Sequence, residues 1–125
     1  MHEIFIERRW AFAKKRFHQG DLIKMNFNPT KGHEQRGFRP ALVVSSNDFN
    51  ELCGGLIKVV AITSEIKDFP LNMELPDGLP VYGQVLLSQE RTIDSLSADR
   101  ECTKVGSVPK EFLEEVLEKI ALTYK

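Results

Sequence analysis

The sequence predicts a mainly β fold with helices, built as a small, strongly bent and largely antiparallel barrel. The first observation is a series of five or six short segments rich in β-branched and aromatic residues, separated by Gly and Pro turns. The second is an amphipathic helix pattern near the C-terminus, with a weaker one near the N-terminus. The third is the length of 125 residues, which fits one domain that buries about two-thirds of its unfolded surface.

Residues 1–19 are expected to form a helical extension ahead of a domain that spans residues 20–125. Apolar side chains recur in this segment at helical spacing, at Ile6, Trp10, Ala13 and Phe17. Acidic side chains lie early in it and basic side chains late, which suits the helix macrodipole. Packing against the domain is the favoured interpretation, because Trp10 and Phe12 prefer burial. Packing on a dimer partner, or contact with RNA through the basic end, stays open as an alternative.

The strands are expected at residues 21–27, 41–45, 56–62, 71–75, 82–87 and 102–108. The continuous apolar runs at 41–45 and 82–87 indicate strands that are buried on both faces. Alternating apolar and polar residues at 71–75 are typical of an amphipathic edge strand. Residues 47–52 are expected to form one helical turn, and the Pro, Asp and Gly at 76–80 a tight turn.

Pro109 opens the clearest helix, because it supplies a preset φ and lacks an N–H that the first turn does not use. Its apolar stripe consists of Phe112, Leu113, Val116, Leu117, Ile120, Ala121 and Tyr124. The opposite face is filled by Glu111, Glu114, Glu115 and Glu118. This pattern indicates packing against the core rather than chemistry.

A polar loop between the first two strands is the strongest candidate for a site. It holds the charged or titratable side chains Lys31, His33, Glu34, Arg36 and Arg39. It is framed by Pro29, Gly32, Gly37 and Pro40. Polar loops that a rigid scaffold displays often carry function, although an ordinary solvated hairpin loop is an open alternative.

Composition excludes several broad classes. The net charge of −1 argues against the basic surface of a general nucleic-acid binder, but the charge is segregated. Residues 1–40 hold nine basic and four acidic side chains, or +5, which leaves −6 for the remainder. No apolar run approaches the roughly 20 residues that span a bilayer. The charged N-terminus does not resemble a signal peptide, so a cytoplasmic location is expected, with Cys53 and Cys102 reduced and structural.

Several kinds of catalysis find no support in the residue pattern. His2, His18 and His33 are far apart, and no paired-carboxylate motif has metal-ligand spacing, so no metal site or cofactor is expected. No Ser lies in the Gly-x-Ser-x-Gly setting of an acyl-transfer enzyme. Gly54-Gly55 lacks the following Lys and Ser or Thr of a phosphate-binding loop.

Three motifs resemble the MazF/PemK family of toxin endoribonucleases. The longest runs from Gly20-Asp21 through Pro29-Thr30-Lys31-Gly32, Glu34-Gln35 and Gly37 to Arg39-Pro40-Ala41-Leu42-Val43. The shorter two are Val60-Ala61-Ile62-Thr63-Ser64 and the segment from Gly83 to Asp94. The resemblance covers nearly everything after Gly20, whereas the first nineteen residues depart from the family pattern. It implies the SH3-like barrel with helices of the MazF/PemK and CcdB toxins, acting as a homodimer.

The resemblance also implies cleavage of single-stranded RNA at short sequences, without a metal ion, leaving a 2′,3′-cyclic phosphate and a 5′-hydroxyl. Such a reaction needs a proton acceptor, a proton donor and a cation that stabilises the phosphorane. Arg39 suits the cation role and Thr63 offers a rigid hydroxyl. Glu34 is the carboxylate of the loop and would act as a base or hold Arg39. These three positions match the family's catalytic residues, while plain structural roles for each stay open.

Seven further residues are candidates for holding RNA: Lys31, Gln35, Arg36, Phe38, Ser64, Gln89 and Arg91. The basic members would neutralise phosphates, and the amides and the serine would read base edges. The aromatic ring would stack on an unpaired base, although a role in the core is an equal alternative for it.

The family resemblance implies a second protein partner, an antitoxin whose disordered acidic tail folds onto the toxin and blocks its RNA groove. Two rival functions remain open at this point. A CcdB-like toxin that binds DNA gyrase without catalysis has no need for Glu34, Arg39 and Thr63 together. A catalytically silent RNA-binding or regulatory module would keep the basic loop yet tolerate the loss of Thr63.

Overall fold

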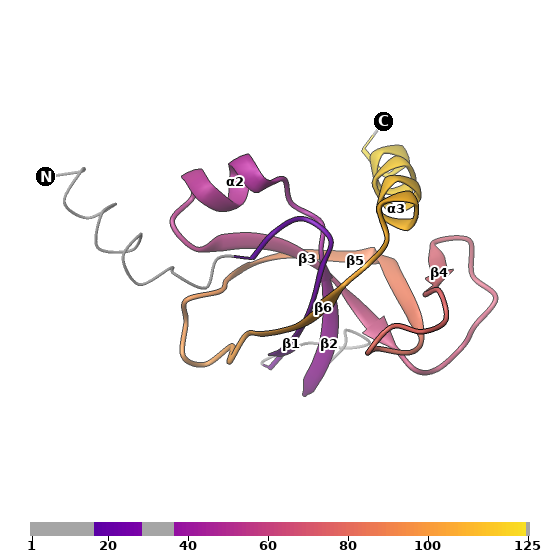
Figure 1. Cartoon of the computed structure of the whole chain (residues 1–125), viewed down its shortest axis with the longest axis horizontal. Coiled ribbons are helices and arrows are strands. Elements are labelled where there is room, and N and C mark those ends of the chain that lie inside the picture. The colour runs from indigo at the N-terminus through magenta and orange to yellow at the C-terminus, as the bar shows by residue number, and fades with distance from the viewer. Residues whose placement is uncertain (1–16, 29–36, 125) are drawn as a thin grey trace, which may run out of the picture.

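The computed structural model describes residues 17–28 and 37–124. Their strands are β1 (Asp21–Asn26), β2 (Phe38–Val43), β3 (Leu56–Thr63), β4 (Asn72–Glu74), β5 (Gln84–Asp94) and β6 (Thr103–Ser107). They form one sheet in the order β4-β5-β3-β2-β1-β6 (Figure 1). Every neighbouring pair is antiparallel. The predicted antiparallel β fold is therefore confirmed.

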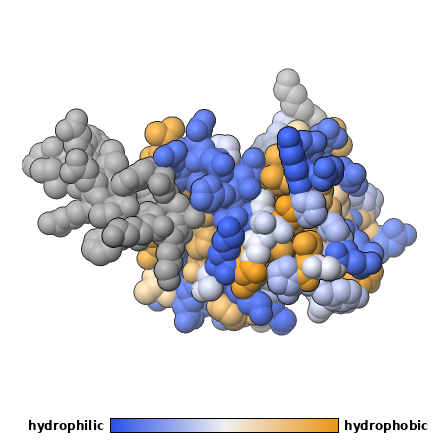
Figure 2. Space-filling model, viewed as in Figure 1, coloured by the Kyte–Doolittle hydropathy of each residue, from blue (hydrophilic) through white to orange (hydrophobic). Residues whose placement is uncertain are grey.

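Two helices lie in the described part of the chain, α2 (Asn47–Leu52) and α3 (Lys110–Leu122). They stand over opposite ends of the sheet (Figure 1). The Ser46 side chain caps α2 by accepting a hydrogen bond from the Phe49 N–H at 3.1 Å. Pro109 is the N-cap of α3, with φ −61° and an extended ψ of 151°, so the helix begins one residue later than predicted. Hydrophilic residues cover the outside of α3, and hydrophobic ones reach the surface beneath it (Figure 2).

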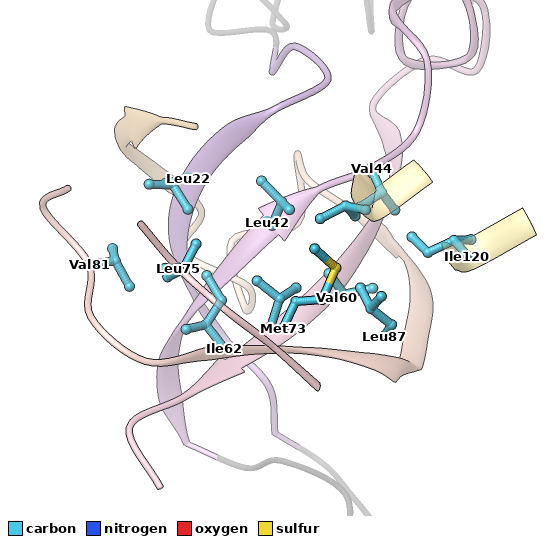
Figure 3. Packing of buried hydrophobic residues seen from close by; sticks show 12 residues of the cluster. Leu22, Leu42, Val44, Val60, Ile62, Met73, Leu75, Val81, Leu87 and Ile120 are labelled. Atoms are coloured by element: carbon cyan, nitrogen blue, oxygen red, sulfur yellow. The ribbon is translucent and has the colours of Figure 1, made fainter. Parts of the chain in front are cut away.

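The sheet carries a hydrophobic cluster on each face, because successive strand residues point to opposite sides. Figure 3 shows the first cluster, in which Leu22, Leu42, Val60 and Ile62 gather with Ile120 of α3. The second cluster takes the alternate strand positions, Ile23, Met25, Phe27, Ala41, Val43, Ile57, Val59 and Ala61, together with Phe17, Leu86 and Ile93. Burial on both faces explains why these strands read as continuous apolar runs.

The sheet does not close into the barrel that the sequence predicted. In the described residues, β4 and β6 end the strand order and do not pair with each other. The connection from β4 to β5 packs against β6, since a Cβ built on Gly106 would lie only 2.6 Å from Pro80 Cγ. Pro80 has no N–H to donate, so this contact is packing rather than a further strand ladder.

The predicted N-terminal helix falls mostly outside the described residues. Of the extension at 1–19, the structure describes only residues 17–19, which form no helix and lead into β1. The helical extension and the domain boundary at residue 20 therefore stay predictions. No helix in residues 17–28 and 37–124 is long and apolar enough to cross a membrane.

Strand β5 is longer than predicted and carries a pronounced bulge. It runs to Asp94, whereas the apolar pattern indicated an end at Leu87. The ladder between β3 and β5 pairs Val60 with Glu90 but Ile62 with Val85. Between these two pairs the chain advances by two residues in β3 but by five in β5. Strand β5 therefore contains three extra residues at this point. Such a bulge bends its strand and re-aims side chains.

Both cysteines are free thiols, and Cys102 packs against the second hydrophobic cluster. Burial raises the pKa of the Cys102 thiol from 9.0 to about 11, with a smaller lowering by Arg100 and a smaller raising by Asp94. The neutral thiol therefore contributes stability below about pH 9 that is lost as the pH rises toward 11.

We expect Cys102 to react slowly with iodoacetamide in the folded protein, because the thiolate is the nucleophile. With a pKa of about 11, about one thiol in a thousand is ionised at pH 8. Peptide mapping should show alkylation of Cys102 rising about tenfold per pH unit up to pH 10. In a urea-unfolded control the rate should level off near pH 9. A plateau near pH 9 in the folded protein would contradict the assigned burial.

Candidate functional site

The end of β3 and the start of β2 bring Arg39 and Thr63 together. The β2–β3 ladder ends with the pair Ala41 and Ala61, and Arg39 and Thr63 stand two residues beyond this pair, one on each strand. Residues two positions apart along a strand lie on the same face of the sheet, so both side chains follow the face of that last pair. Both residues line one hollow of about 300 Å³. Arg39 is exposed and Thr63 is half-buried, so the hollow is open to a large ligand.

The other residues that line this first hollow are Pro40, Ile62, Ser64, Glu65 and Tyr82. A second hollow, also of about 300 Å³, is lined by Thr63, Glu65, Lys67, Phe69, Asn72, Leu86, Ser88 and Gln89. Thr63 and Glu65 belong to both, so they lie between two adjoining hollows. The β5 bulge explains the second hollow, because Ser88 and Gln89 are among the extra residues that it turns toward Thr63. An extended ligand can therefore occupy both sides of Thr63.

Thr63 is held by its neighbours from two directions. Its Oγ1 accepts a hydrogen bond from the Glu65 N–H at 3.1 Å. Its backbone is packed against Gly83, where an added Cβ would meet the Thr63 carbonyl oxygen at 2.1 Å. A hydroxyl fixed in this way is preorganised for a ligand, which lowers the cost of binding.

Gln84 anchors the loop that follows Thr63. It pairs with Thr63 in the β3–β5 ladder, and its side chain is only 6 % exposed. Its Oε1 accepts hydrogen bonds from the Lys67 N–H at 3.0 Å and from Asn72 Nδ2 at 3.1 Å. One buried amide thus ties together the ladder, the loop and β4. Losing the acceptor would remove both hydrogen bonds, and a typical intramolecular hydrogen bond contributes about 0.5–1.5 kcal/mol to stability.

Two further charges beside Thr63, besides Arg39, come from this loop. Lys67 Nζ lies 3.5 Å from Glu65 Oε1, and the two side chains are 66 % and 73 % exposed. Exposed ion pairs contribute little to stability, so Lys67 can exchange its partner for a phosphate at small cost. Among residues 17–28 and 37–124, no three His, Cys, Asp or Glu side chains gather as a metal site would require.

The predicted site residues fall into three groups. Arg39, Thr63 and Ser64 line the first hollow, and Gln89 lines the second. The second group, Phe38 and Arg91, lines neither of these two hollows. Phe38 is 55 % exposed at the start of β2, and the Arg91 guanidinium carbon lies 5.6 Å from the centre of the Phe27 ring. The remaining four, Lys31, Glu34, Gln35 and Arg36, lie outside the described residues.

Sequence reasoning missed five residues that the structure brings to the site: Glu65, Lys67, Tyr82, Gln84 and Ser88. Tyr82 was expected to begin a buried strand, and that prediction was wrong, because β5 begins at Gln84 and Tyr82 is 72 % exposed. The adjacent Gly83 was the available signal, since a glycine before an apolar run often marks close backbone approach.

This fold and site define a class: a small protein built on one antiparallel sheet, with a polar site at strand ends that is open to an extended ligand. The family of PemK-like, MazF-like toxins of type II toxin–antitoxin systems matches residues 18–124. Because this match covers most of the chain, the protein belongs to that family.

Relatives and solved structures agree with this assignment. The endoribonuclease toxin ChpB of Escherichia coli K12 is 37% identical over an alignment of 110 residues, gaps included, that covers 83% of this chain and 90% of that protein. The endoribonuclease toxin MazF of the same strain is 38% identical over 101 residues, covering 81% of this chain and 87% of MazF. The crystal structure of MazF from Deinococcus radiodurans superposes with a TM-score of 0.77 at 36% identity, over 86% of this chain and 94% of that chain.

Proposed function

We propose that this chain, a MazF-like toxin endoribonuclease, cuts single-stranded RNA at short sequences by attack of the substrate's own 2′-hydroxyl on the adjacent phosphorus. The O2′–P bond forms as the P–O5′ bond breaks, which leaves a 2′,3′-cyclic phosphate and a 5′-hydroxyl. The proton of the 2′-hydroxyl passes to a base, and a proton is delivered to the leaving 5′-oxygen. No metal ion takes part in these steps.

The observation that carries the proposal is the placement of Arg39 and Thr63 in one open hollow. The Arg39 guanidinium would stabilise the negative charge that grows on the phosphoryl oxygens. The Thr63 hydroxyl, already oriented by the Glu65 N–H, would donate to the same phosphate. Glu34 is proposed as the base or as the group that holds Arg39, in line with the family resemblance. A gyrase-binding toxin has no use for this pair.

The remainder of the RNA is proposed to lie along the two adjoining hollows. Lys67 supplies a positive charge on the far side of Thr63, and Ser88 and Gln89 supply polar groups for base edges. Ser64 would do the same in the first hollow. Five further residues are proposed to contact RNA on the basis of the sequence alone: Lys31, Gln35, Arg36, Phe38 and Arg91.

The proposed partners follow from the family. A MazE–MazF complex from Deinococcus radiodurans superposes on this chain with a TM-score of 0.73 at 32% identity. We propose a cytoplasmic homodimer controlled by an antitoxin whose disordered acidic tail covers the RNA site. The segregated charge supports this, because +5 in residues 1–40 suits an acidic segment.

The test is to incubate purified, antitoxin-free protein with a long single-stranded RNA in EDTA and to map the ends of the fragments. We expect discrete cuts with 2′,3′-cyclic phosphate and 5′-hydroxyl ends, because the nucleophile comes from the substrate. A substrate with a single 2′-deoxy residue at the cut position should resist cleavage there. Intact RNA from folded protein, or fragments with 5′-phosphate ends, would overturn the proposal.

A further inference from the structure

We propose that Tyr82 is a stacking platform for one unpaired RNA base beside the cleaved phosphate. The inference rests on the proposed RNA cleavage and adds a residue to its specificity. Tyr82 lines the first hollow together with Arg39 and Thr63. Its side chain is 72 % exposed, so the ring face is available to a ligand in the unbound protein.

The ring is exposed although the chain on both sides of it is buried. Val81 is 7 % exposed and belongs to the first hydrophobic cluster, and Gln84 is buried at the start of β5. Tyr82 therefore projects from a firmly anchored segment and adds little to the core. An exposed aromatic ring alone needs no explanation, but this ring shares a hollow with an arginine and a threonine at the proposed reacting phosphate.

The distance between Tyr82 and Thr63 is fixed by backbone packing. Gly83 has φ +133°, and an added Cβ would lie 2.1 Å from the Thr63 carbonyl oxygen and 3.2 Å from Ser64 Cα. The residue after Tyr82 thus touches the backbone of Thr63 and Ser64 directly. A base that stacks on the ring is held at a set position from the phosphate at Thr63, which is the positioning that cleavage at a defined site needs.

Stacking on an aromatic ring is the usual way in which proteins hold splayed single-stranded bases. Tyrosine loses little conformational entropy on binding, since it has only two side-chain torsions. The cationic and hydroxyl neighbours of Tyr82 favour a nucleotide as its occupant. A segment of the antitoxin is the rival occupant, and the experiment below separates the two.

The experiment measures steady-state cleavage of a short single-stranded RNA that carries one cut site. Replacing Tyr82 with alanine should raise KM about 5- to 30-fold, as the loss of one stacked base predicts, with kcat changed much less. Tyr82→Phe and Tyr82→Trp should retain activity, because stacking needs the ring and not the hydroxyl. Tyr124→Ala is the matched control, since Tyr124 is 65 % exposed and lines neither hollow.

Abasic substitutions at each of the four positions around the cut then test for stacking directly. One of them should weaken binding to the wild-type protein and have no further effect on Tyr82→Ala, because the same contact is already lost. A KM for Tyr82→Ala within twofold of wild type would overturn the proposal, and unchanged RNA kinetics with weakened antitoxin binding would assign Tyr82 to the antitoxin. The proposal would also be overturned if the abasic substitution at each of the four positions weakened RNA binding by Tyr82→Ala as much as it weakens binding by the wild-type protein. If Arg39→Ala cleaves at the wild-type rate, the proposed catalytic site fails, and if folded wild-type protein leaves the RNA intact, the proposed function itself fails, whatever the Tyr82 variants do.

Discussion

Replacing Arg39 with alanine is expected to slow RNA cleavage by about 10²- to 10³-fold in kcat, the range seen when one preorganised transition-state donor is removed. Arg39 is exposed and lines the same open hollow as Thr63. The negative charge on the phosphoryl oxygens grows in the transition state, so a fixed guanidinium acts mainly on kcat rather than on KM. Single-turnover cleavage with saturating protein measures this quantity.

Two further variants make the Arg39 result specific. Arg39→Lys keeps the charge but loses the planar fork, so we expect a loss intermediate between wild type and Arg39→Ala. Lys110→Ala removes the same charge from the exposed first residue of α3, outside both hollows, and should cleave at the wild-type rate. Equal cleavage rates for Arg39→Ala and Lys110→Ala would show that Arg39 takes no part in the reaction.

Much of the fold could be predicted from the sequence because its signals are local. The apolar runs marked the strands, and Pro109 with the following stripe marked α3. Arg39 and Thr63 could be chosen as candidates because each stands beside an apolar run and because the family resemblance implies this pair. That they share one hollow depends on the β2–β3 register, which no local pattern gives.

The rest of the site depends on contacts between residues far apart in the chain. The hydrogen bond from the Lys67 N–H to Gln84 joins residues 17 positions apart in the sequence. A glutamine next to an apolar run does not indicate in the sequence which group it will bind. The three-residue bulge in β5 brings Ser88 and Gln89 to Thr63, and periodicity cannot reveal a register shift between two strands. The packing of Pro80 on Gly106 in place of a β4–β6 ladder is likewise a contact between residues far apart in the chain.

Replacing Gly83 with alanine is expected to lower the free energy of unfolding by about 2 to 6 kcal/mol and to abolish cleavage in the fraction that still folds. Two costs add up at this position. A φ of +133° is strained for any residue with a Cβ, at about 1–3 kcal/mol. The new Cβ would also lie 2.1 Å from the Thr63 carbonyl oxygen, and forcing apart packed groups costs about 1–3 kcal/mol more. The backbone that must move is the one that holds Thr63.

Gly78 provides the matched control for Gly83, because it also has a positive φ, of +87°, but open space where the Cβ would stand. Gly78→Ala should therefore cost only the backbone strain of about 1–2 kcal/mol and leave cleavage unchanged. Urea unfolding followed by circular dichroism gives the two stabilities, and cleavage assayed at a temperature where both variants are folded gives the activities. Equal losses of stability in the two variants would mean that a Cβ at position 83 does not clash with the Thr63 backbone. Full activity in a folded Gly83→Ala variant would mean that the position of Thr63 does not limit the reaction.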